Sequence, residues 1–152
     1  MQSLQEGFEK QGQPVNFGTM AHDHEMYLNL ADTAMELRDE VAIKKYAPML
    51  EELAMRDNHK LYLAIAHRAQ GVGLHLAGKN AEAEMRLHQA LEIFTELGCR
   101  WQMGRTLFEL AQLSAKKKAK AREYFLQALS AFEEIQAVHY AEQARSALSS
   151  LG

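Results

Sequence analysis

Residues 71–98 have the sequence GVGLHLAGKNAEAEMRLHQALEIFTELG. The run starts inside one expected helix, passes through a turn at Gly78-Lys79-Asn80, and contains a second complete helix that ends at Gly98. Apolar residues recur at helical spacing in this second helix, and a glycine directly after it is the usual left-handed cap. The stretch therefore predicts a helical hairpin, and a similar pattern lies on both sides of it.

The composition indicates a folded, helical chain. Of its 152 residues 47% are hydrophobic, Ala and Leu are abundant, and there are only 2 Pro. Such a chain can bury the core of one domain or of a short repeat array, and its bias favours helix over strand. The net charge of −3 and a pI near 6.2 argue against a dedicated nucleic-acid binder.

Cysteine content and apolar patterning indicate a soluble protein of the cytoplasm. Cys99 is the only cysteine, so the chain cannot form an internal disulfide, which is typical of a reducing compartment. No apolar run approaches the roughly 18–20 residues that a membrane helix needs, and the N-terminus lacks the apolar core of a signal peptide. We therefore expect no membrane contact and a cytoplasmic location.

Local signals divide the chain into a tail and a helical region. Residues 1–20 are expected to be a tail or a partial helix, and Asp23 is the expected N-cap of the first full helix. Pro48 should kink or restart the second helix, because proline lacks a donor and clashes with the preceding turn. Gly71 and Gly73 fall in mid-helix, where each costs about 1 kcal/mol relative to Ala, so they predict a close approach of two helices.

Small residues recur at a nearly constant interval. Ala83 and Ala121 are 38 residues apart, and so are Ala90 and Ala128. A period of about 34–40 residues with two helices in each unit is typical of a helical solenoid, whose units bury their apolar faces against one another. Residues 21–152 are therefore expected to form hairpins at about 21–57, 58–98 and 99–136, followed by a capping helix at 138–151.

The pattern resembles the tetratricopeptide repeat over about residues 22–136. The small residue of that family's first helix falls on Gly71, and the Ala–large–Ala series of its second helix falls on Ala83, Leu87 and Ala90. The family's early tryptophan and closing proline are absent from the matching positions. The run EIFTELGCRWQMGRTLFELAQLSA is similar to the longer-period repeats of bacterial signalling ATPases, nucleotide cyclases and LuxR-like regulators. This resemblance implies an all-α, right-handed superhelix.

In tetratricopeptide proteins the first helix of each hairpin lines a concave groove, and the resemblance places ten residues there. Exposed Leu28, Val72 and Phe108 among charged neighbours would form a recognition surface. The groove would be acidic towards residues 22–40 and basic towards residues 100–120, and would hold an extended or helical peptide. The expected groove residues are Glu25, Leu28, Asp32, Met35, Arg68, Val72, His75, Arg105, Phe108 and Gln112.

Catalytic and metal-binding patterns are weak. The two histidines of His22-Asp23-His24-Glu25 point to different faces of a helix, so they do not converge on a metal ion. Cys99 follows a helix C-terminus, which disfavours a thiolate nucleophile. We therefore expect no catalytic residue, no metal site and no cofactor. Lys116 to Lys120 are interpreted as solvated cations near a helix end.

These observations predict a non-catalytic interaction scaffold that binds a protein or peptide. We expect it to bind neither nucleic acid nor a membrane. It is expected to be a component of a larger bacterial signalling or regulatory protein. Truncating Phe108, or reversing the charges of Arg68 and Arg105, should weaken partner binding and leave the helix content intact. Two alternatives stay open: a module for self-association, such as a homodimer, and a metal-dependent enzyme that uses the histidines.

Overall fold

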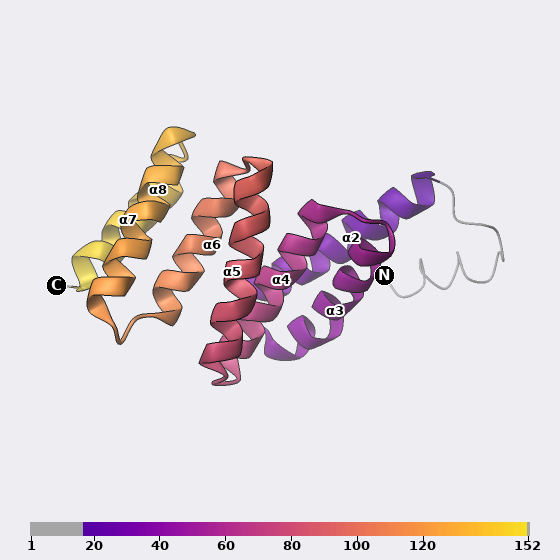
Figure 1. Cartoon of the computed structure of the whole chain (residues 1–152), viewed down its shortest axis with the longest axis horizontal. Coiled ribbons are helices and arrows are strands. Elements are labelled where there is room, and N and C mark those ends of the chain that lie inside the picture. The colour runs from indigo at the N-terminus through magenta and orange to yellow at the C-terminus, as the bar shows by residue number, and fades with distance from the viewer. Residues whose placement is uncertain (1–16, 152) are drawn as a thin grey trace.

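The structure, a computed structural model, describes the backbone of residues 17–151 and the side chains from residue 23 onwards. Within that range every regular element is a helix, which confirms the predicted all-α class. Figure 1 shows the helices following one another along the molecule, with α2 and α3 near one end and α7 and α8 at the other. The helices are α2 (Phe17–Glu36), α3 (Glu40–Arg56), α4 (Lys60–Leu76), α5 (Asn80–Leu97), α6 (Arg100–Leu113), α7 (Lys118–Glu134) and α8 (Val138–Leu151).

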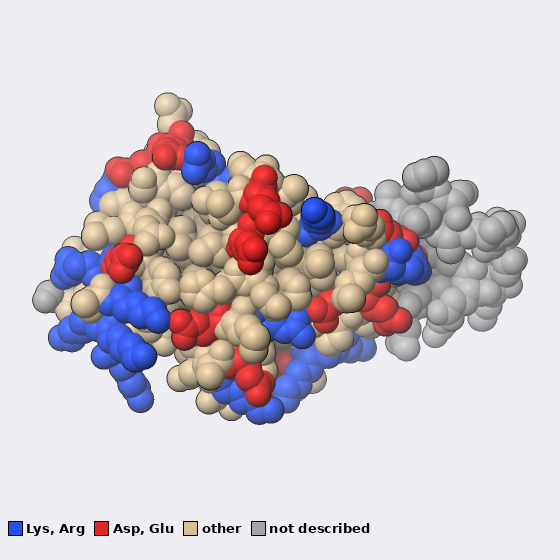
Figure 2. Space-filling view, in the orientation of Figure 1, with Lys and Arg blue, Asp and Glu red and all other residues tan. Residues whose placement is uncertain are grey.

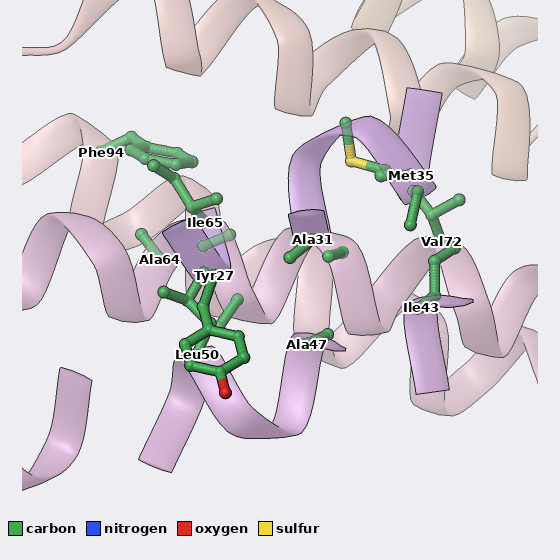
Figure 3. Packing of buried hydrophobic residues seen from close by; sticks show 14 of the residues in the cluster. Tyr27, Ala31, Met35, Ile43, Ala47, Leu50, Ala64, Ile65, Val72 and Phe94 are labelled. Carbon is green, nitrogen blue, oxygen red and sulfur yellow. The ribbon is translucent and has the colours of Figure 1, made fainter. Parts of the chain in front are cut away.

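Each helix packs against the next one in the chain, and α4 also packs against α2 and touches α6. The largest apolar cluster lies between α2, α3 and α4 and is closed at one side by Phe94 of α5. Figure 3 shows part of this cluster, with Met35, Ile43 and Val72 gathered together. Smaller clusters join α6, α7 and α8 around Phe132 and Phe125. The buried apolar residues therefore form one large cluster in the first half of the molecule and two smaller ones in the second.

Glycines allow the helices to approach closely, as the sequence predicts. A Cβ atom on Gly71 of α4 would lie 2.8 Å from Cγ of Leu87 in α5, and one on Gly73 would lie 2.8 Å from Cγ2 of Ile43 in α3. Real Cβ atoms do not tolerate such distances, so a larger residue would push the helices apart or displace these side chains. Gly104 in α6 has the same relation to Phe132 in α7.

Several of the helices are followed by a residue in the left-handed backbone conformation. Gly98 after α5 has φ 69°, which confirms its predicted role as a cap. Arg38, Asn58 and Gln136 occupy the same conformation after α2, α3 and α7, with φ of 55°, 54° and 58°. Asn tolerates this region, whereas Arg and Gln carry a steric cost. The cost is offset by backbone bonds of the turns, such as Asp39 N–H to the carbonyl of Ala34 at 3.0 Å.

At the start of the helical region the structure overturns one local prediction and one alternative of a second. Asp23 lies inside α2, which begins at Phe17, so it is not an N-cap. Pro48 does not restart a helix, because α3 is continuous across it. Packing of α3 against α2 and α4 compensates for the missing hydrogen bond, and only the carbonyl of Lys44 is left without its usual intrahelical donor. The expectations for residues 1–16 lie outside the described residues.

None of the described helices combines the length and the apolar character needed to cross a bilayer.

Candidate binding surfaces

The residues predicted to line a groove include charged side chains that contact one another instead of solvent. Arg68 of α4 is fully buried, and its guanidinium donates to Asp32 Oδ1 of α2 at 3.3 Å and to Gln102 Oε1 of α6 at 2.7 Å. Its guanidinium carbon lies 5.1 Å from the centre of the Phe94 ring. Arg68 therefore joins three helices and is not available to a partner.

Two further arginines extend this network. Arg105 of α6 donates to Asp32 at 3.0 Å and also pairs with Glu36. Arg38, directly after α2, donates to Glu109 Oε1 and Gln112 Oε1, both at 2.8 Å. Charges of the stretch at residues 22–40 and of the stretch at residues 100–120 thus pair with each other. We call this set of interhelical contacts the α2–α4–α6 network.

The network shifts the pKa of its arginines in opposite directions. Burial, together with the nearby positive charge of Arg105, lowers the pKa of Arg68 to about 10. Although burial also acts to lower it, the neighbouring Asp32 and Glu36 raise the pKa of Arg105. Both arginines therefore remain charged at neutral pH.

The predicted exposure of Val72 is wrong, and Met35 also lies in the core. Their exposed fractions are 2% and 1%. The reason is that α2 packs directly on α4, so the side chains between these helices fill a core instead of lining a groove. Leu28 and His75 are half-buried, whereas Glu25 is exposed.

Part of the predicted surface survives between α6 and α8. Phe108 and Gln112 line a recess of about 580 Å³ there, which is open to solvent and mostly polar in its side chains. The ring of Phe108 packs edge-on against that of Phe125, and the two ring centres are 5.2 Å apart. The other residues that line the recess are His139, Glu142, Gln143 and Ser146.

A larger groove of about 870 Å³ is lined by residues of α3, α4 and α5. Figure 1 shows helix α4 lying between α3 and α5. The lining residues of the groove recur at intervals of three and four along each helix, so each helix contributes one stripe. We call it the α3–α4–α5 groove. Its stripes are Ile43, Lys44, Pro48, Glu51 and Met55 on α3; Leu63, His67, Gln70, Gly73, Leu74 and Ala77 along α4 to its C-cap; and Lys79, Glu82, Met85, Arg86 and Gln89 at the start of α5.

A polar cluster forms part of this groove's floor. Arg86 of α5 donates from Nη1 to Glu51 Oε2 and to His67 Nδ1, both at 2.7 Å. Gln70 donates to the other oxygen of Glu51 at 3.0 Å. These polar groups satisfy one another across three helices, so they fix the floor of the groove before any partner arrives.

The cluster also sets the ionisation of its members. Burial acts to raise the pKa of Glu51, but the hydrogen bonds from Arg86 and Gln70 and the charge of Arg86 outweigh it and lower that pKa. Burial and the charge of Arg86 lower the pKa of His67, against the opposing effect of Glu51. His67 is therefore neutral at pH 7, as its acceptor role at Nδ1 requires.

Two methionines stand on the rim of the groove. The exposed fractions of Met55 and Met85 are 66% and 59%. Methionine is flexible and polarisable, and it is common on surfaces that adapt to apolar partners. Sequence reasoning missed this groove because the family resemblance assigned binding to the first helix of each hairpin. The signal that could have revealed it is the regular stripe from Leu63 to Ala77, which mixes apolar and polar residues.

His24, which the sequence places in a metal-like run, instead contacts the turn between α3 and α4. Its Nε2 lies 2.8 Å from Asp57 Oδ2, and its ring packs edge-on against His59 and Tyr62. His59 is the N-cap of α4, and its Nδ1 accepts the N–H of Tyr62 at 3.4 Å. Across residues 23–151, no three His, Cys, Asp or Glu side chains are grouped as metal ligands.

Comparisons of the chain with protein-family models, with curated proteins and with solved structures find no match. The surfaces described above are therefore the basis for any functional conclusion.

Proposed function

We propose that this protein is a non-catalytic interaction module that binds a segment of a partner protein in the α3–α4–α5 groove. The groove itself carries the proposal: it is open, preformed, and combines exposed methionines with a small number of fixed polar groups. Its volume of about 870 Å³ is at the upper end of the range for ligand sites.

We further propose that the helices form a right-handed superhelix like that of tetratricopeptide proteins. The order of packing supports this, since α2 with α3, α4 with α5 and α6 with α7 are adjacent antiparallel pairs, and α8 follows on α7. The close approach at Gly71 and Gly104, which lie in the first helices of successive pairs, is a second support. Both features belong to stacked helical hairpins.

The place of binding differs from the one that the sequence predicts. Arg68 and Arg105 already hold Asp32, so a partner that approached the α2–α4–α6 network would have to break interhelical ion pairs. In contrast, the rim of the α3–α4–α5 groove offers Met55 and Met85 without any such cost. Binding at the groove buries apolar surface that is otherwise exposed to water, which is favourable.

Selection of peptides on the full chain tests the proposal. A displayed library of random 14-residue peptides should yield binders of the wild-type protein that no longer bind the double variant Met55→Arg with Met85→Arg. Both positions are exposed, so the substitutions place charge in the groove without disturbing the core.

The matched control is the double variant Leu126→Arg with Val138→Arg. These residues are also exposed and apolar, at 50% and 64%, but they lie outside the groove. Binding should survive in this control. The proposal is wrong if no peptide is enriched above background, or if the enriched peptides bind the Met55 and Met85 variant as well as the wild type.

A further inference from the structure

We propose that the occupant of the α3–α4–α5 groove is an amphipathic helix of about 14 residues with acidic side chains in the terminal turn that lies beside Lys44 and Lys79. The inference rests on the proposed function and gives the partner its chemistry. Three features carry it: the length and shape of the groove, the hydrogen bonding of its walls, and the charge at one of its ends.

The length of the groove matches a short helix. Its stripe along α4 runs from Leu63 to Ala77, which are 14 positions apart and, at 1.5 Å per residue, span about 21 Å. Two helices form the walls and a third forms the floor, so the space continues the packing of helix on helix that builds the rest of the molecule. Apolar residues at i, i+4, i+7 and i+11 of the occupant, which span about 16 Å at 1.5 Å per residue, would meet Leu74, Met85 and Leu63.

The hydrogen bonding of the walls favours a helix over an extended strand. An extended peptide needs partners for its own N–H and C=O groups, usually from the open edge of a sheet. The lining of this groove comes from helices, whose backbone groups are bonded internally, apart from the Lys44 carbonyl that Pro48 leaves without a donor and the first N–H groups of α5. An occupant that satisfies its own backbone groups, as a helix does, suits these walls.

One end of the groove is positively charged. Lys44 of α3 and Lys79 of the α4–α5 turn line it, and Figure 2 shows Lys and Arg gathered along the edge that carries the α4–α5 and α6–α7 turns. Lys44 is 70% exposed and is held only by Glu40 at 3.4 Å.

The two acids among the lining residues do not cancel this charge for a partner. Glu51 is neutralised by Arg86 at 2.7 Å. Glu82 is the one acid of the lining at this end, and against Lys44 and Lys79 it leaves a net charge of +1 there. Carboxylates of the occupant would therefore find their partners at Lys44 and Lys79, and the other end of the groove, at Met55 and Leu63, would receive apolar side chains.

The experiment reads the sequences of peptides selected on the full wild-type chain, and repeats the selection on the double variant Lys44→Glu with Lys79→Glu. Wild-type binders should show helical apolar spacing and Asp or Glu concentrated in one terminal turn. Binders of the variant should carry Lys or Arg there instead. Each wild-type peptide should bind the variant about fivefold to tenfold more weakly, since two exposed ion pairs become repulsive.

The matched control is the double variant Lys117→Glu with Lys118→Glu, which makes the same charge change at exposed lysines outside the groove. It should select the same peptides as the wild type. The inference is overturned if groove binders are basic, lack helical spacing, or select identically on wild type and on the Lys44 and Lys79 variant. In those cases loss of binding in the Met55 and Met85 variant would leave the proposed function standing, whereas absence of binders would overturn both.

Discussion

Arginine side chains are buried between α2, α4 and α6, whereas methionine side chains are exposed at the rim of the α3–α4–α5 groove. Arg68 is fully buried and bonded to two other helices, but Met55 and Met85 have more than half of their surface in water. Both regions contain α4, so a single helix presents a closed interface with buried charges on one side and an open groove with exposed methionines on the other.

The comparison teaches that the neighbours of a side chain, and not its type, decide whether it is available to a partner. A stripe of charged residues on a helix is commonly interpreted as a solvated or partner-binding face. Here such a stripe supplies contacts between helices, because the acidic end of the chain and its basic second half fold against each other. The predictions below test the two regions in turn.

Replacing Arg68 with Ala should have the largest effect. Removal of the buried guanidinium takes away the donor to Gln102 and one donor to Asp32, and leaves a cavity, so we expect a loss of about 3 kcal/mol in the free energy of unfolding. Urea denaturation followed by circular dichroism measures it. Arg145→Ala is the control, because the Arg145 pair with Glu133 is about half exposed and should contribute little. Equal effects of the two variants would show that the network does not hold the helices together.

Reversing the charge of Arg105 should destabilise the fold by about 2 kcal/mol, because Arg105→Glu would place a third carboxylate beside Asp32 and Glu36. Adding Glu36→Arg should restore part of the loss by reversing the second partner as well. The thermal midpoint of each variant is the measurement. If the Arg105→Glu variant is stable and loses only peptide binding, the binding site lies at the α2–α4–α6 network and not in the α3–α4–α5 groove.

Lowering the pH from 7.5 to 5.5 should reduce stability by a smaller amount. The pKa of His59 is lowered by burial and by the neighbouring His24, and that of His67 is lowered by burial and by Arg86. Both folded-state pKa values lie below the ordinary value of about 6.5, so below that pH the unfolded chain binds more protons and the free energy of unfolding falls. Urea denaturation at the two pH values measures the difference.

The variant His59→Asn separates the two histidines. Asparagine keeps an acceptor at the N-cap of α4 but does not titrate, so the pH dependence should become shallower while stability at pH 7.5 is maintained. An unchanged pH dependence would mean that His59 is not among the groups responsible.

The smallest effect is expected for the rim of the groove. The double variant Met55→Arg with Met85→Arg should change the free energy of unfolding by less than about 0.5 kcal/mol, because both side chains are largely exposed. Denaturation in urea checks this beside the Arg68 series. A large destabilisation would show that the methionines support the fold and would remove the contrast between the two regions.

The fold class and much of the local helix packing could be predicted from periodicity and small residues. Gly71 and Gly73 indicate close approach because nothing else justifies glycine in mid-helix, and the left-handed cap at Gly98 follows from its place after a periodic run. In contrast, a kink or a restart was expected at Pro48, but α3 continues through it without a restart, because tertiary packing on α2 and α4 overrides that local preference.

The candidate site was harder to predict, since it depends on which helix faces meet. The positions of Asp32, Arg68 and Arg105 in the sequence do not show that they converge, because 36 and 73 residues separate Asp32 from its two partners. Likewise, Met85 shares the apolar character of core residues, and only the placement of α5 relative to α3 leaves it on a rim. Composition and spacing predict which residues share a face of a helix, whereas the packing of the helices decides which of these faces remains exposed to solvent.

The ion pairs between α2 and α6 also affect how the molecule comes apart. In an array whose members touch only their neighbours, each end can fray independently. Here Arg105 reaches back 69 positions to Glu36, so opening of α2 removes support from α6 and couples the elements between them. Residues 23–113 should therefore open as one cooperative unit with similar protection from hydrogen exchange, while α8, anchored on α7, exchanges first.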